Sequence, residues 1–151
     1  MTDVLVVGTV ALDTIQTPFG KAENALGGSA SYAAFSASFF VKPAIVSVIG
    51  KDFPEEYIKL LKKKEIDTEN IQIADKTFRW SGSYEFDMNE ANTLSTELNS
   101  LATFKPEVKE EYKDAKYVFL ANIDPEVQQS VIGQLKNPSL IVLDTMNFWI
   151  E

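Results

Sequence analysis

The stretch VLVVG at positions 4–8, continued by TVALD at positions 9–13, decides the fold of this chain. A short run of valine and leucine that ends at a glycine is typical of a strand buried on both faces of a parallel sheet. Apolar runs of similar length recur at 44–49, 117–120 and 140–143, and helical segments separate them. This alternation predicts an α/β domain with a mostly parallel sheet and flanking helices.

Two segments do not fit the alternation, and they predict a second, smaller sheet. Residues 11–25 read as an extended stretch that Pro18 and Gly20 interrupt. Residues 77–98 are rich in threonine, serine and aromatic side chains, which favour β-strands, and the sequence DMNEANT at 87–93 supplies a turn. We therefore expect a β-hairpin or an edge sheet in this part of the chain.

Local capping signals predict where several helices begin. Asp52 lies two residues before a proline, so we expect it to cap the helix that follows. Residues 106–112 read as a short polar helix. Asp124 comes directly before a proline and a glutamate, which predicts a capped helix running to about residue 135.

Composition excludes several kinds of chemistry. The 151 residues contain no cysteine and no histidine, which excludes disulfides, thiolate nucleophiles, Ser-His-Asp triads and Cys- or His-ligated metal sites. A net charge of −8 argues against a nucleic-acid surface. The chain has no apolar run long enough to cross a membrane, and its opening reads as a strand rather than a signal peptide. We expect a cytoplasmic protein that binds neither nucleic acid nor membrane.

Two features near the start are candidates for ligand binding. Asp13 follows the first strand, where a carboxylate could accept hydrogen bonds from two neighbouring hydroxyl groups of a polyol. Gly27 and Gly28 precede a helix of small residues, where glycine lets the backbone approach a ligand and helix-start amides bind oxygens. The alternatives are a turn or cap aspartate and a tight turn into a packed helix. The glycine pair lacks the Gly-Lys-Ser/Thr ending of a P-loop.

The sequence TFRWSGSY at 77–84 is a third candidate. The Trp80 ring could stack on a sugar or a base, and Arg79 could meet an anion. The alternative is an amphipathic strand pair that packs at a contact between sheets or between two copies of the chain.

Polar residues also follow two of the apolar strands. Asn122 comes after the strand at 117–120, and Asp144 and Asn147 come after the strand at 140–143. Ligand sites of α/β proteins form at the carboxyl ends of such strands. Loop and cap chemistry explains these residues equally well.

Taken together, these motifs resemble the ribokinase-like (PfkB) carbohydrate kinase family, in order and over nearly the whole chain. The matching positions are residues 8–13, Gly27-Gly28, IGKD at 49–52, EIDT at 65–68 with Glu65 in place of the family's glycine, and DTMN at 144–147. The resemblance implies that residues 1–151 are the N-terminal part of a ribokinase-like domain. The C-terminal ATP-binding half, with the catalytic aspartate of its Gly-Ala-Gly-Asp motif, is expected to be absent.

The resemblance also implies roles for individual residues. Those expected to line the acceptor site are Asp13, Gly27, Gly28, Tyr32, Trp80 and Asn122. Asp144 and Asn147 are expected near the phosphate or Mg²⁺ region. Tyr32 stands where the family has an asparagine, and Phe148 and Trp149 stand where an arginine often follows.

The family enzyme transfers the γ-phosphoryl group of ATP, with Mg²⁺, to a hydroxyl of a sugar or nucleoside. The resemblance implies that residues 11–25 and 77–98 form a β-sheet lid over the substrate and that two chains form a homodimer through it. No catalytic residue and no metal ligand is expected within this chain.

Three functions are compatible with these observations. The first is the acceptor-binding half of a sugar or nucleoside kinase, inactive as this chain alone. The second is a non-catalytic module that binds ligands or dimerises through the aromatic lid. The third is an NAD-binding Rossmann domain, which the sequence disfavours because residues 8–13 lack the Gly-x-Gly-x-x-Gly turn.

Overall fold

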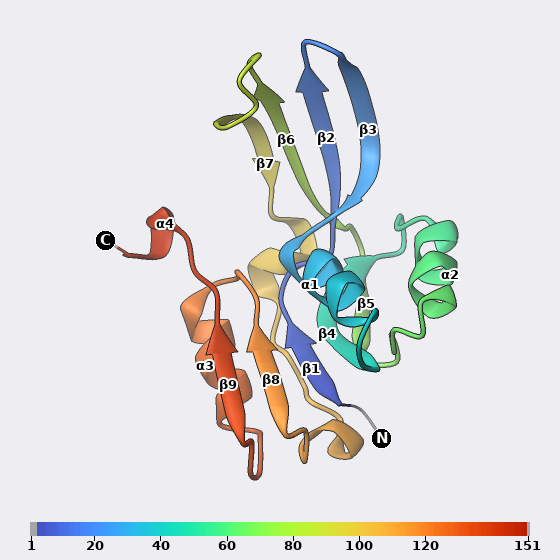
Figure 1. The fold of residues 1–151 in the computed structure, drawn as a ribbon, viewed down its shortest axis with the longest axis vertical. Helices are drawn as coiled ribbons and strands as arrows, with labels where there is room; N and C mark the ends of the chain where they lie inside the picture. Colours follow the sequence, from blue (N-terminus) through green and yellow to red (C-terminus); the bar gives the residue numbers. More distant parts are fainter. Residues whose placement is uncertain (1–2, 151) are drawn as a thin grey trace.

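The computed structural model describes residues 3–150, apart from the side chains of residues 147 and 148, and it contains two sheets (Figure 1). The larger sheet has five strands in the order β5-β4-β1-β8-β9, and each neighbouring pair is parallel. Its strands are β1 (Val4–Val7), β4 (Pro43–Gly50), β5 (Ile71–Ala74), β8 (Tyr117–Leu120) and β9 (Leu140–Leu143). The predicted parallel α/β architecture is confirmed.

The smaller sheet projects from the carboxyl end of the larger one, at the top of Figure 1. It has four strands in the order β3-β2-β6-β7. They are β2 (Ala11–Thr17), β3 (Gly20–Gly27), β6 (Phe78–Tyr84) and β7 (Ala91–Glu97), and we call them together the lid. β2 and β6 pair in parallel, and each forms an antiparallel hairpin with its outer neighbour. The predicted second sheet is therefore also confirmed.

Helices cover both faces of the parallel sheet. One face packs against α1 (Ser29–Ala37) and α2 (Glu55–Lys63), in a core with Val6 and Ile45 at its centre. The other face packs against α3 (Pro125–Ile132) and two 3₁₀ turns, η1 (Asn99–Thr103) and η2 (Glu110–Tyr112), around Leu5 and Val7. A final short helix, α4 (Asn147–Ile150), follows β9. Successive β1 side chains thus enter opposite cores, because side chains of a strand alternate between its two faces.

Three local predictions need correction. Residues 106–112 do not form a helix, since only η2 at their end is helical and Val108 instead lies in the core, where its backbone amide donates to Gln134 Oε1 at 2.9 Å. The helix at Asp124 ends at Ile132, earlier than residue 135, although Asp124 caps it as predicted by accepting from the Glu126 amide. Asp52 does not cap α2, because Pro54 occupies the cap position and the Asp52 carboxylate points to the lid.

The turn before β5 explains one departure from the family pattern. Glu65 stands where the resemblance predicts glycine, and its φ of 57° lies in the left-handed region that glycine adopts at low cost. The turn keeps its conformation with a residue that favours it less. Asp67, two positions later, accepts a hydrogen bond of 2.7 Å from the Tyr112 hydroxyl and so joins this turn to η2.

A buried glutamine joins the carboxyl ends of β8 and β9. Gln128 of α3 has only 2% of its surface exposed. Its side-chain amide lies within hydrogen-bond distance of the backbone oxygens of Leu120, Ala121 and Asp144, at 3.0–3.2 Å. Buried carbonyl groups require such partners, and this one side chain therefore fixes the relative height of the two strand ends.

One part of the sheet lies open. On the face that α1 and α2 cover elsewhere, β8 and β9 expose Tyr117, Leu140 and Val142 around an apolar hollow of about 140 Å³. Contiguous apolar surface of this kind is typical of a contact with another polypeptide.

Within residues 3–150, no helix is long and apolar enough to cross a bilayer.

Candidate acceptor-binding site

The candidate site lies where the chain passes between the two sheets. After β1 the backbone enters the lid through β2 and returns through β3 to the start of α1. The pairing of β2 with β3 places Ala11 opposite Gly27 and Asp13 opposite Ala25. Asp13 therefore meets Gly27 and Gly28, which lie 14 and 15 positions later in the sequence, at the base of the lid.

Asp13 lies directly against Gly27. A Cβ atom at position 27 would come within 1.9 Å of Asp13 Oδ2, so any larger residue would displace the carboxylate. No described group donates a hydrogen bond to this carboxylate, and burial raises the pKa of Asp13 from its usual 3.8 to about 6. A half-buried acceptor without a protein donor is suited to hydroxyl groups of a ligand.

Gly28 makes the close turn into α1. Its φ is 93°, and a Cβ atom there would come within 2.3 Å of the Thr9 carbonyl oxygen. Both the left-handed conformation and the missing space require glycine at this position. The next residue, Ser29, continues the junction by hydrogen bonding to Thr9 and, at 2.8 Å, to the Asn122 carbonyl oxygen.

The other predicted site residues differ in what surrounds them. Asn122 belongs to the same junction through its backbone, while its side-chain oxygen accepts from Trp149 Nε1 at 3.1 Å. Tyr32 lies on α1 with its ring mostly exposed. Asp144 is exposed after β9, and the side chain of Asn147 lies outside the described part of the structure.

Trp80 is brought to Asp13 by the pairing of β2 with β6. The two residues are opposite each other in the parallel register, and such partners project from the same face of a sheet. The indole nitrogen donates to Thr93 Oγ1 of β7 at 3.2 Å. The structure therefore brings together four of the predicted residues: Asp13, Gly27, Gly28 and Trp80.

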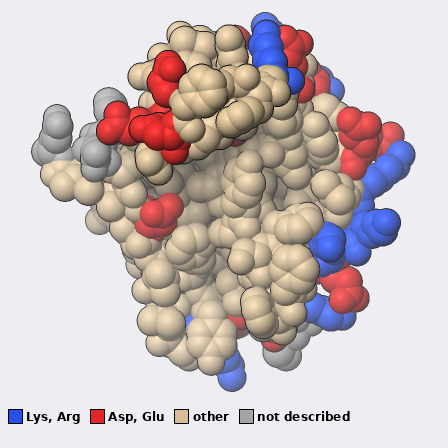
Figure 2. All heavy atoms as spheres, turned by 45° about the horizontal axis from the view of Figure 1, so that its top comes forward, with Lys and Arg blue, Asp and Glu red and all other residues tan. Residues whose placement is uncertain are grey.

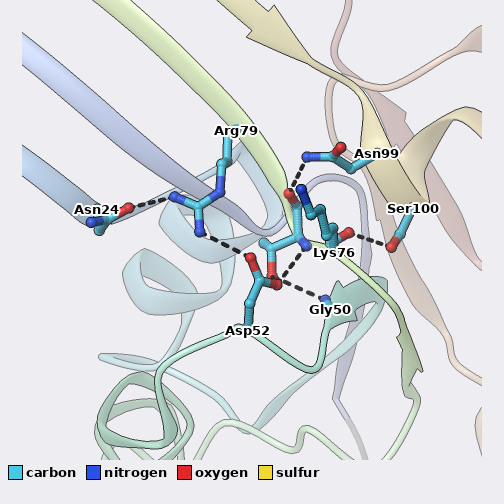
Figure 3. Close-up of polar contacts among 8 residues, drawn as sticks. Asn24, Gly50, Asp52, Lys76, Arg79, Asn99 and Ser100 are labelled. Carbon is cyan, nitrogen blue, oxygen red and sulfur yellow. Dashed lines mark hydrogen bonds and ion pairs between the residues drawn. The ribbon is translucent and has the colours of Figure 1, made fainter.

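A polar cluster that sequence reasoning missed holds the lid to the body (Figure 3). Arg79 of β6 donates to Asp52 Oδ2 at 2.9 Å and to Asn24 Oδ1 of β3 at 2.5 Å. Asp52 Oδ1 accepts from the backbone amide and the hydroxyl of Thr77, each at 2.8 Å. The Gly50 amide donates to the same hydroxyl.

This Asp52–Arg79 cluster changes the interpretation of both charged residues. The sequence made Arg79 one candidate for binding an anion, beside a packing role, and in the structure its guanidinium is engaged by Asp52 and Asn24. Burial opposes the charge on Asp52, but the hydrogen bonds from Arg79 and Thr77 outweigh it and lower the pKa of that carboxyl. The sequence signal was the polar step at 50–52, directly after a buried strand.

The described residues contain no cluster of carboxylates that could hold a magnesium ion. Among residues 3–150, apart from the side chains not described, no group of three carboxylates lies close enough to hold a metal ion.

Comparison with known proteins identifies relatives over nearly the whole chain, although no family model matches it. A cytidine kinase of Thermococcus kodakarensis is 31% identical over 144 residues, which are 94% of this chain and 51% of that protein. The nucleoside kinase of Methanocaldococcus jannaschii, described as an archaeal member of the ribokinase family, superposes on this chain with a TM-score of 0.68 at 19% sequence identity. The match covers 95% of this chain and 52% of that kinase.

A third protein, a putative ribokinase II from E. coli in complex with ATP and Mg²⁺, superposes with a TM-score of 0.75 at 13% sequence identity. The match covers 95% of this chain and 53% of the E. coli protein. The chain thus spans about half the length of the proteins it matches. The resemblance noted from the sequence motifs is confirmed.

We expect substitution of Asp13 by asparagine to stabilise the protein above pH 6 and to have little effect below pH 4. The carboxylate pKa is raised on folding, so its ionisation opposes folding progressively between the two values, 3.8 and about 6. Allowing for partial exposure, the gain at pH 8 is about 1–2 kcal/mol in the free energy of unfolding. Urea unfolding at pH 4 and pH 8 measures it, with the exposed Glu107→Gln as control. A pH-independent effect would contradict the assignment.

We expect Arg79 and Asp52 to be coupled by about 0.5–1 kcal/mol at pH 7 in a double-mutant cycle of Arg79→Met and Asp52→Asn. The coupling should vanish as the pH falls below 3.8, because Asp52 has a lowered pKa and loses its charge only in that range. The Lys51–Asp75 pair is the matched control, since its side chains are 73% and 93% exposed. Equal coupling in both pairs would show that the Asp52–Arg79 cluster does not hold the lid.

Proposed function

We propose that this chain, which resembles the ribokinase-like (PfkB) family in sequence motifs and in fold, is the acceptor-binding half of an ATP-dependent sugar or nucleoside kinase. The observation that carries the proposal is Asp13, a half-buried carboxylate without a described donor, held against Gly27 at the base of the lid. Its two oxygens accept hydrogen bonds from two neighbouring hydroxyls of the acceptor and fix the orientation of the sugar ring.

The reaction of the complete enzyme is proposed to be phosphoryl transfer with ATP and Mg²⁺. The bond between the γ-phosphorus and the β–γ bridging oxygen breaks, a bond to the acceptor oxygen forms, and the acceptor hydroxyl loses its proton. Such catalysis depends on positioning and charge stabilisation more than on covalent chemistry of the protein. The described residues of this chain contribute the positioning of the acceptor, and we expect no turnover of ATP by this chain alone.

The proposed location of the protein is the cytoplasm.

A second candidate function is assembly through the lid. Phe19, in the turn between β2 and β3, and Phe86, after β6, stack edge to face with ring centroids 5.9 Å apart, and each is 77% exposed. Large aromatic side chains held rigidly at a surface are enriched in protein interfaces. We propose that the partner is a second copy of the chain.

The acceptor site is tested by binding. We expect isothermal titration of the purified chain with a panel of sugars and nucleosides to detect at least one ligand, and Asp13→Ala to weaken it by 10-fold or more, since hydrogen bonds to a charged group contribute about 1.5–3 kcal/mol. Glu107→Gln, an exposed carboxylate away from the lid, is the control. A coupled assay for ADP release should stay at background. Steady turnover by the purified chain would contradict the half-enzyme proposal.

The assembly proposal is tested by light scattering. We expect the wild-type mass to be that of a dimer and the double variant Phe19→Ser, Phe86→Ser to be monomeric. Phe40→Ser is the matched control, because Phe40 is 87% exposed but lies after α1, outside the lid. A monomeric wild type, or a dimer that survives the double substitution, would refute a lid-mediated dimer.

A further inference from the structure

The side chain of Trp80 lies along the lid instead of standing out from it. A Cβ atom at Gly82 would come within 2.1 Å of Trp80 Cη2 and 2.3 Å of Cζ2. The six-membered ring of the indole therefore occupies the space that a side chain at position 82 would fill. Residues i and i+2 of a strand share a face, so only glycine at 82 allows the ring to lie down on the sheet.

The ring is also held from its other end. Trp80 Nε1 donates to Thr93 Oγ1 at 3.2 Å, and Thr93 is the β7 residue that pairs with Gly82. The indole thus extends from Trp80 over Gly82 toward β7. Trp80 is partly exposed, and no described aromatic ring or cation stacks on it. Its orientation is fixed by the lid alone, before any ligand arrives.

Asp13 is the residue that pairs with Trp80 on the neighbouring strand of the lid. The paired strands, β2 and β6, are about 4.8 Å apart at the backbone, so the two side chains leave the same face of the lid, and the indole then extends over Gly82 toward β7. In the view toward the lid, the charged side chains gather mostly at the margins and the hollowed centre is lined mostly by uncharged residues (Figure 2). One face of the lid thus carries both a flat aromatic surface and, at its base, the Asp13 carboxylate.

We propose that the acceptor is a nucleoside, whose base stacks on the Trp80 indole while its ribose hydroxyls bind Asp13. This inference rests on the proposed acceptor site and names its substrate class. A free sugar would satisfy Asp13 but would leave the indole face without a matching planar partner. Stacking of a base on an aromatic side chain is sequence-tolerant, because every base has a π-face. Trp80 is therefore the residue that makes the site bind nucleosides more tightly than free sugars, and it discriminates only weakly among the bases.

Titration calorimetry of the purified chain with cytidine, adenosine and D-ribose tests the proposal. We expect the two nucleosides to bind at least 10-fold more tightly than ribose, and Trp80→Ala to reduce their affinity about 10-fold or more while ribose binding stays unchanged. Trp80→Phe should retain most of the nucleoside affinity. Phe40→Ala, an exposed aromatic after α1 and outside the lid, is the control and should change none of the three affinities.

Gly82→Ala provides a second variant that keeps the tryptophan. Its Cβ would displace the indole from the sheet, so nucleoside affinity should fall toward that of ribose with the ring still present. Circular dichroism and thermal unfolding establish that each variant is folded, and retained ribose binding establishes it at the site. If Trp80→Ala leaves nucleoside affinity unchanged while ribose binds, the inference is overturned and the proposed function stands. If wild type binds neither ribose nor a nucleoside, both are overturned.

Discussion

The arrangement depends on the contact between Asp13 and Gly27. The chain leaves the parallel sheet after β1, forms β2 and β3, and returns to α1, so both sheets share one short junction. Because residue 27 has no side chain, the carboxylate of Asp13 sits in the corner between strand and helix start. Burial there raises the pKa of Asp13 to about 6, and the protein thus retains an acceptor that is costly to charge and that no described group satisfies. A ligand with hydroxyl groups removes part of that cost, which is the physical basis of the proposed site.

The Asp52–Arg79 cluster supports this junction from outside. It ties β3 and β6 of the lid to the loop after β4, through charge-assisted hydrogen bonds at 2.5–2.9 Å. The base of the lid is thus fixed on two sides, while its tip, with Phe19 and Phe86, carries exposed aromatic rings. The anchored base and the exposed aromatic tip match the two roles proposed for the lid, which are positioning the acceptor and contacting a second chain.

The fold could be predicted from sequence further than the site could. The strands at 4–8, 44–49, 117–120 and 140–143 were recognisable because each is a short apolar run, as is typical of parallel strands, although β9 at the edge of the sheet is largely exposed. The helix predicted at 106–112 is wrong because tertiary packing outweighs local helix propensity in this polar segment. Val108 is buried in the core, and its backbone amide donates a hydrogen bond to the Gln134 side chain instead of to a helical carbonyl group. Asp52 was assigned to a local cap because its partner Thr77 is 25 residues away, and no local pattern predicts such a pair.

Local chemistry in the sequence determined the kind of fold, the second sheet and the candidate residues Asp13, Gly27, Gly28 and Trp80, because periodicity, glycine and strand-end polarity are properties of short segments. Only the tertiary structure decided which of them meet. Strand register is a long-range choice, and it set Trp80 opposite Asp13 on the lid. The packing of the loops beyond the strands turned the Asn122 side chain to Trp149 and paired Arg79 with Asp52. A site is a set of distances between segments, and those distances are set when the two sheets pack.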